Sequence, residues 1–294
     1  MTAGPTIPNI PAAPDADRLA RHPIDTRLPA LLRSGQRLRG IFNGLPSPAI
    51  VEMCAYAGFD FIVIDNEHGS ADLQTTEHML RAARASGIPP IVRCLEHDIA
   101  RTLDMGASGL QIPMVNTPEH AAALVPRVRS PSPPSPPSPA SPSNPGHGAG
   151  GGQRGSAFSS RAAGYGAFGG PAHTRRSNDG LVLVVMLETP QAVANAGAIA
   201  AVPGVDAVFV GPNDLAHSMG HENRWTDAPV QQAIEQALRA VAAAGNCPGI
   251  LALTAAEEDH YATWGARYFA TVSTGVITQA LRQAARGGRP AVVY

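Results

Sequence analysis

Three ionisable residues stand close together in the segment Asp65-Asn66-Glu67-His68-Gly69, directly after an apolar run. A histidine whose ring nitrogen is held by a carboxylate is fixed in one tautomer and is more basic, which suits a general base near neutral pH. The segment therefore predicts a base at His68. The alternative interpretation is a polar surface loop with ordinary charges.

Arg93 ends another apolar run, Ile91-Val92-Arg93. An arginine that follows a buried run is expected to face the end of a strand rather than bulk water. A fixed, always-charged donor at that place suits a carboxylate or an enolate oxygen. A structural ion pair is the alternative for this residue.

Two further acids, Glu188 and Asp214, each follow an apolar run, the second within Gly211-Pro212-Asn213-Asp214-Leu215. Hard oxygen donors from neighbouring strands can share one cation. Because no cysteine or second histidine lies nearby in the sequence, the donors favour Mg²⁺, Mn²⁺ or Co²⁺ over structural zinc. For either acid alone the alternative is helix N-capping, since carboxylates favour the N-terminal end of a helix.

Short apolar runs alternate with longer helix-like stretches, as expected when parallel strands are joined by crossover helices. Eight runs are near-continuously apolar, which is typical of strands buried on both faces. They are Arg39–Asn43, Phe61–Asp65, Ile91–Arg93, Gly109–Met114, Leu181–Leu187, Asp206–Val210, Pro248–Leu251 and Tyr268–Val272. Eight strands predict a (β/α)₈ barrel, in which the chemistry is done at the carboxyl ends of the strands.

Helices are expected between these runs. They are Ala49–Ala57, Thr75–Ser86, Pro118–Val128, Pro190–Ala201, Val230–Ala244, Ala255–Trp264 and Thr278–Arg286. Thr189 followed by Pro190 has the pattern of an N-cap with proline at the first helical position. Glu188 therefore lies where a strand ends and a helix begins.

One tract, residues 130–152, breaks the alternation. It begins Ser-Pro-Ser-Pro-Pro-Ser-Pro-Pro and ends mostly in glycine, so that neither a helix nor a central strand is expected there. Its place between the fourth and fifth strands makes it an inserted polyproline-like or disordered loop in one βα connection, within a single domain spanning 28–294. Residues 1–27 are expected to form a loose extension, because prolines interrupt them and no apolar run appears.

The composition agrees with a small-molecule enzyme. With 44% hydrophobic and 15% charged residues and a net charge of -1, the chain offers no cationic surface for nucleic acid, and no membrane span is expected. Cys54, Cys94 and Cys247 form no CxxC pair, which argues against a zinc cage or a disulfide framework and fits the cytoplasm. The 22 basic residues are all arginines, so a Schiff-base lysine is excluded.

In their order, the motifs Asp65-Asn66-Glu67-His68, Val92-Arg93, Glu188-Thr189 and Gly211-Pro212-Asn213-Asp214-Leu215 form a specific combination. With Ile112-Pro113-Met114-Val115 and Arg154-Gly155, they resemble the metal-dependent (class II) pyruvate aldolases of the 4-hydroxy-2-oxoheptanedioate and 2-keto-3-deoxy sugar acid aldolase family. The resemblance extends from Gly40 to the final helix.

The resemblance implies a (β/α)₈ barrel of the phosphoenolpyruvate/pyruvate-domain type, assembled as a homo-oligomer, usually a hexamer, in which the last helix packs on a neighbour. It assigns a divalent cation to Glu188 and Asp214, and the base role to His68, oriented by Asp65. It assigns pyruvate binding to Arg93 and to the backbone around Gly211, Pro212 and Asn213.

Two departures from the family stand out. Met186 occupies a position that is often glutamine, which is expected to shift substrate preference more than to remove activity. The Pro/Ser/Gly tract replaces a short Tyr-Pro-Pro-x-Gly connection, and we expect it to loosen the mouth of the site. A locally shifted reading frame is another explanation of this tract, which resequencing of the gene would test.

The implied reaction is the reversible retro-aldol cleavage of a 4-hydroxy-2-oxo acid to pyruvate and an aldehyde. Two alternatives remain from the sequence. One is a lyase of citryl- or malyl-coenzyme A thioesters on the same scaffold. The other is a catalytically impaired barrel that is retained for binding or assembly.

Overall fold

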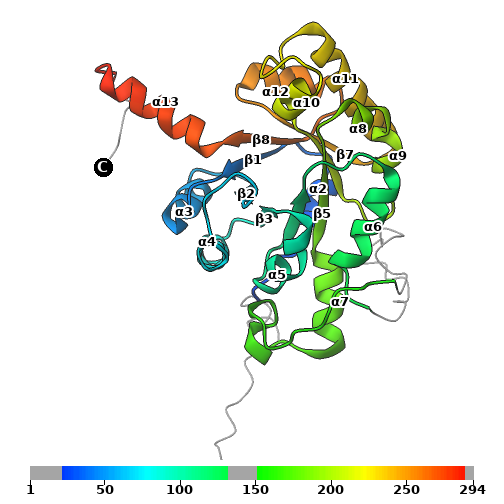
Figure 1. Cartoon of the computed structure of the whole chain (residues 1–294). Helices are drawn as coiled ribbons and strands as arrows, with labels where there is room; N and C mark the ends of the chain where they lie inside the picture. The colour runs from blue at the N-terminus through cyan, green and yellow to red at the C-terminus, as the bar shows by residue number, and fades with distance from the viewer. Residues whose placement is uncertain (1–21, 132–150, 289–294) are drawn as a thin grey trace, which may run out of the picture.

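The computed structural model describes residues 22–131 and 151–288, which form a barrel of eight parallel strands surrounded by helices (Figure 1). The strands are β1 (Leu38–Asn43), β2 (Phe61–Asp65), β3 (Pro90–Arg93), β4 (Gly109–Ile112), β5 (Val182–Leu187), β6 (Ala207–Val210), β7 (Cys247–Leu251) and β8 (Tyr268–Val272). Each strand pairs with the next along the chain, and β8 pairs with β1 to close the sheet. The predicted (β/α)₈ barrel is confirmed.

The helices occupy the crossover connections between the strands. The main ones are α2 (Leu28–Arg33), α3 (Pro48–Tyr56), α4 (Leu73–Ser86), α5 (Ile99–Asp104), α6 (Pro118–Val128), α7 (Gly170–Gly180), α8 (Pro190–Ala194), α9 (Ala196–Ala200), α10 (Pro212–Ser218), α11 (Ala228–Ala243), α12 (Ala255–Ala262) and α13 (Ser273–Ala285). Two short 3₁₀ helices, η1 (Glu96–Asp98) and η2 (Arg161–Gly166), complete the connections.

Two apolar clusters hold the barrel together. The outer cluster lies between the strands and the helices, and the inner cluster fills the barrel. Inside the barrel, the ring of Tyr268 stacks on Phe61 and meets Phe209 edge-on, with ring centroids 4.5 and 5.6 Å apart. Gly249 makes room for this packing, because a Cβ there would come within 2.4 Å of the Tyr268 ring. The interior is therefore a packed core rather than a channel.

Several helices differ from the sequence-based expectation. The single helix expected over Pro190–Ala201 is two helices, α8 and α9, which are separated at Asn195. The side chain of Asn195 donates to the carbonyl of Asn116, and its backbone leaves the helical region at φ -96°, ψ 3°. The last helix begins at Ser273, five residues before the expected Thr278. Helices α2, α5, α7 and α10 were not predicted.

The N-terminal segment is better packed than expected. Residues 22–27 of the expected loose extension lie against the barrel, where Ile24 and Asp25 are buried and the Asp25 N–H donates to the Ser108 hydroxyl at 2.8 Å. The earlier residues lie outside the described part of the chain. So does most of the predicted inserted loop, residues 132–150, although the flanks of the insert meet where the Arg154 N–H donates to the Arg129 carbonyl at 2.9 Å.

Helix α13 leaves the barrel after β8 and extends away from it (Figure 1). Only Ser273 of this helix is buried, and Val276 and Leu281 are exposed. Among the described residues, none of the helices is both long enough and apolar enough to cross a bilayer.

Candidate active site

Arg93 and Asp65 form a buried ion pair at the carboxyl ends of β3 and β2. The two residues are register partners in adjacent strands, so their side chains meet on the same side of the sheet. Arg93 donates from Nε and Nη2 to the two carboxylate oxygens of Asp65 at 2.9 and 2.6 Å. Burial alone would raise the pKa of Asp65, but the hydrogen bonds and charge of Arg93 bring it below its ordinary value. Both groups therefore stay charged, and the guanidinium is held rigidly.

The Arg93 guanidinium is supported from below by the barrel core. Its central carbon lies 5.0 Å from the centroid of the Phe42 ring, and Phe42 in turn meets Phe209 edge-on. Burial opposes the charge of Arg93, yet the hydrogen bonds that it donates to Asp65 and the nearby carboxylates raise its pKa overall. The ion pair with Asp65 is the structural alternative considered for Arg93, and it leaves the side chain as a fixed positive group at the carboxyl end of β3.

Glu67 and His68 follow Asp65 in the β2–α4 connection. Asp65 Oδ1 accepts the backbone N–H of Glu67 at 3.1 Å and that of His68 at 3.2 Å, which fixes the loop. Glu67 Oε2 lies 3.2 Å from Arg93 Nη1 and 3.7 Å from His68 Nε2. Burial raises the pKa of Glu67, and this effect outweighs the opposing charges of Arg93 and His68. The His68 side chain is 62% exposed.

The orientation of His68 differs from the expectation. Asp65 was expected to hold the imidazole, but its carboxylate is engaged with Arg93 and contacts His68 only through the backbone. The carboxylate beside the ring is that of Glu67, whose Oε2 is buried and has no hydrogen-bond partner within the described residues. Sequence reasoning included Glu67 in the ionisable cluster but gave it no role. Because Asp65 and Glu67 both lie within three residues of His68, the sequence could not show which of the two acids is beside the imidazole ring.

Glu188 is almost fully buried just beyond the end of β5. Its Oε2 accepts the backbone N–H of Met114 at 2.7 Å, and Met114 adopts a left-handed backbone with φ 57°, which is uncommon for a residue other than glycine. Burial, opposed by the Met114 hydrogen bond and reinforced by the charge of Asp214, raises the pKa of Glu188 to about 7.

Asp214 lies in the first turn of α10, and the chain brings this helix against Glu188. A Cβ on Gly211 would come within 2.8 Å of Glu188 Cγ and 2.9 Å of its Oε1, so only glycine permits this approach. At the other end of α10, the Ser218 hydroxyl lies 2.9 Å from the backbone carbonyl of Glu188, to which it donates. Pro212 is buried and Asn213 is exposed beside this contact.

Neither acid caps a helix. The cap of α8 is Thr189, whose hydroxyl accepts the Ala192 N–H at 3.1 Å, and the N-cap of α10 is Gly211 without a side-chain hydrogen bond. Glu188 thus has no capping role, whereas Asp214, in the first turn of α10, keeps the favourable interaction with the helix N-terminus that the alternative describes. The charge of Asp214 raises the pKa of both Glu67 and Glu188, and the charge of Glu67 adds to the rise at Glu188, while the positive charge of Arg93 opposes both effects.

The donor set fits a hard divalent cation. Two oxygen donors from adjacent strand ends, with no cysteine among them, match the preference of Mg²⁺ and Mn²⁺, which retain several waters or substrate oxygens. Within residues 22–131 and 151–288, no group of three or more His, Cys, Asp or Glu side chains is arranged to hold a metal.

Comparison with known proteins assigns the family. Residues 38–280 match the family described as HpcH/HpaI aldolase/citrate lyase. The chain belongs to this family. The match covers all eight strands of the barrel. With relatives named as aldolases over most of its length, the chain is a carbon–carbon lyase of the aldolase type.

Individual relatives agree with this assignment. The chain is 38% identical to a hydroxypyruvate/pyruvate aldolase of Deinococcus radiodurans, over 90% of this chain and 88% of that protein. It is 35% identical to a 5-keto-4-deoxy-D-glucarate aldolase of Salmonella paratyphi C, over 83% and 89% of the two chains. A solved HpcH/HpaI aldolase/citrate lyase family protein from Burkholderia cenocepacia has a TM-score of 0.79 and 33% identity, covering 90% of this chain and all of that one.

Proposed function

We propose that this aldolase cleaves a 4-hydroxy-2-oxo acid reversibly to pyruvate and an aldehyde, with a divalent cation held by Glu188 and Asp214. The observation that carries this proposal is the buried Glu188 carboxyl group beside the glycine-permitted approach of α10, which carries Asp214. The names of the relatives support the substrate class, since they are aldolases of hydroxypyruvate/pyruvate and of 5-keto-4-deoxy-D-glucarate.

A cation held by these two acids would supply Lewis-acid polarisation of the 2-oxo group, as Mg²⁺, Mn²⁺ and Co²⁺ do. The Met114 N–H fixes one oxygen of Glu188, and Ser218 ties the end of α10 to the Glu188 backbone. These contacts limit the movement of the Glu188 carboxyl group and of α10, which carries Asp214. The absence of lysine from the chain supports this route, because the imine route needs a lysine amine.

The residues of the β2 and β3 ends would handle charge and protons. His68 accepts the proton of the 4-hydroxyl group, directly or through a water, while the C3–C4 bond breaks and the aldehyde leaves. Arg93, held by Asp65, places fixed N–H donors toward the negative charge that develops on the 2-oxo acid. Return of a proton to C3 gives pyruvate. Backbone groups around Gly211, Pro212 and Asn213 would receive the substrate carboxylate, as the family resemblance implies.

Pyruvate release tests this function. We expect purified protein with Mn²⁺ or Mg²⁺ to release pyruvate from 5-keto-4-deoxy-D-glucarate, to lose the activity on chelation and to regain it when the cation is restored. Asp214→Asn should abolish the cation-dependent turnover. Cleavage of citryl- or malyl-coenzyme A instead would favour the thioester lyase, and no turnover of either class would indicate a barrel retained for binding.

We also propose that α13 packs on a second copy of the chain. The helix stands away from its own barrel and exposes Val276 and Leu281, which are 47% and 64% exposed (Figure 1). Apolar side chains presented on a projecting helix are stabilised when another subunit covers them. This arrangement supports a homo-oligomer formed by exchange of the helix, and the family resemblance implies a hexamer.

A further inference from the structure

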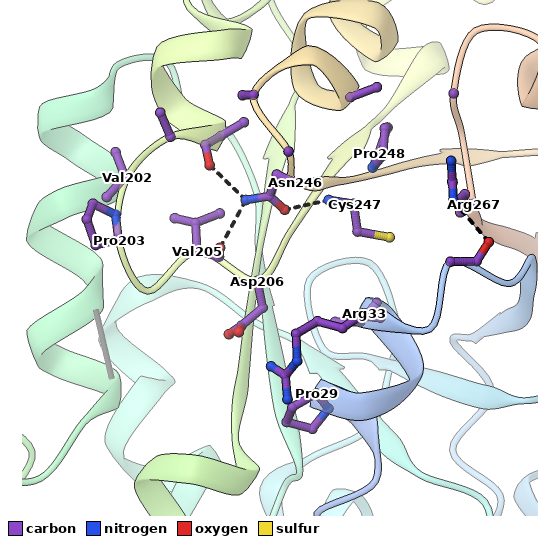
Figure 2. A pocket seen from close by; sticks show the side chains of 18 residues that line it. Pro29, Arg33, Val202, Pro203, Val205, Asp206, Asn246, Cys247, Pro248 and Arg267 are labelled. Atoms are coloured by element: carbon purple, nitrogen blue, oxygen red, sulfur yellow. Dashed lines mark hydrogen bonds between the residues drawn. The ribbon is translucent and has the colours of Figure 1, made fainter. Parts of the chain in front are cut away.

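A second cavity lies at the end of the barrel opposite Glu188 and Asp214 (Figure 2). Its lining includes Asp206, Cys247 and Arg267, which stand at the amino-terminal ends of β6, β7 and β8. The volume is about 690 Å³, within the range of small-molecule sites. The packed barrel interior separates it from the proposed active site. Catalysis in this fold belongs to the other end, so the cavity needs its own explanation.

The charge that this cavity offers to a ligand is positive. The side chain of Arg33, in α2, forms no hydrogen bond or ion pair with any residue in the described part of the chain. Arg267 donates from Nη1 to the Gly35 carbonyl at 3.1 Å but contacts no carboxylate among the described residues. Figure 2 shows Arg267 at one side of the cavity and Arg33 below.

The acid in the lining does not cancel these charges. The carboxylate of Asp206 accepts the Leu183 N–H at 2.8 Å and forms an ion pair with the buried Arg129 at 3.3 Å. Asp206 is therefore engaged within the barrel wall. Two guanidinium groups remain available, and arginine suits carboxylates and phosphates because its donors can bind two oxygens at once.

The rest of the lining combines one fixed polar side chain with small apolar ones. Asn246 is fixed by three hydrogen bonds, since Nδ2 donates to the carbonyls of Ala200 and Val205 at 2.8 and 3.0 Å and Oδ1 accepts the Cys247 N–H at 2.7 Å. Small apolar side chains such as Val202 and the alanines at the ends of α9 and α11 form the wall. A preformed site of this kind costs little ordering when a ligand enters.

We propose that this cavity binds a small organic anion, such as a carboxylate or a phosphate monoester, whose apolar body lies against the α9 and α11 ends while its charge meets Arg33 and Arg267. Such a ligand does not compete with the substrate, because the two sites are at opposite ends of the barrel. Its binding stabilises the folded chain by mass action.

Calorimetric titration of the full chain with phenyl phosphate tests the proposal. We expect saturable binding that weakens as salt is added, with much weaker binding of benzyl alcohol and of benzylammonium, which lack the negative charge. The double variant Arg33→Gln, Arg267→Gln should lose about tenfold or more in affinity, since charge-assisted hydrogen bonds are lost. Arg282→Gln, on the exposed face of α13, is the matched control and should bind as the wild type does.

Two further variants keep the test decisive. Ala244→Phe should fill the cavity and remove binding without a change of charge, and Asp214→Asn should leave binding intact because its site is at the other end of the barrel. Equal affinity of the double arginine variant and the wild type would overturn the proposal. Loss of binding in Asp214→Asn would also overturn it, because the probe would then occupy the active site.

Discussion

Replacement of Glu188 by glutamine tests whether this carboxyl group is held ready for a cation. Glu188→Gln keeps the shape of the side chain and an oxygen that can accept the Met114 N–H. The variant removes only the charge. In the metal-free wild type, burial raises the pKa of Glu188 from 4.5 to about 7, with Asp214 adding to the effect.

The sign of the pH dependence follows from this raised pKa. Between pH 4.5 and about 7 the unfolded chain releases the Glu188 proton while the folded chain retains it, so the free energy of unfolding falls as the pH rises. The difference between the two pKa values corresponds to about 3 kcal/mol, at about 1.36 kcal/mol for each pKa unit. Glu188→Gln stays neutral and escapes this penalty.

Urea unfolding in the presence of a chelator measures the effect. We expect Glu188→Gln to match the wild type near pH 4.5 and to exceed its free energy of unfolding by up to about 3 kcal/mol at pH 8. Glu52→Gln, at an exposed position of α3, is the matched control and should show no such pH-dependent gain. Added Mn²⁺ should stabilise the wild type and leave Glu188→Gln unchanged. A difference between variant and wild type that is the same at pH 5 and pH 8 would refute the reasoning.

Three other substitutions probe the remaining parts of the account. His68→Ala should lower kcat for pyruvate release by about 10²-fold or more, whereas His97→Ala, at another exposed histidine, should not; an unchanged rate for His68→Ala would remove this base from the mechanism. Gly211→Ala should weaken Mn²⁺ binding by about tenfold or more in a spectroscopic titration, because its Cβ displaces Glu188; undiminished affinity would contradict the packing argument. Leu281→Glu should lower the molar mass measured by light scattering, and an unaltered mass would argue against exchange of α13.

The barrel was predictable because its strands are buried on both faces and therefore read as continuous apolar runs. The bounds of β2 and β8 agree with the sequence-based ranges, since polar or small residues mark both ends of each run. Helix α7 was missed for a physical reason. Its sequence is rich in glycine and polar residues, and tertiary contacts hold it, such as the hydrogen bond from Asn178 Nδ2 to the Ser130 carbonyl at 2.9 Å.

The sequence indicated which residues lie at the carboxyl ends of the strands better than it indicated which of their side chains contact one another. Arg93, Glu188 and Asp214 were found because each ends or follows a buried run, and the barrel closes these ends into one rim. The partner of Asp65 could not be read from the sequence. His68 is three residues away along the chain, but the β2–β3 register places Arg93 opposite Asp65 in space. Three-dimensional register, rather than sequence distance, decides which charges meet.

The most direct test of the central claim is the anomalous diffraction of Mn²⁺ in crystals of the protein. The account predicts one strong Mn²⁺ peak coordinated by carboxylate oxygens of both Glu188 and Asp214, within reach of Arg93 and His68. A peak that involves only one of the two acids, or that lies elsewhere in the molecule, would contradict it.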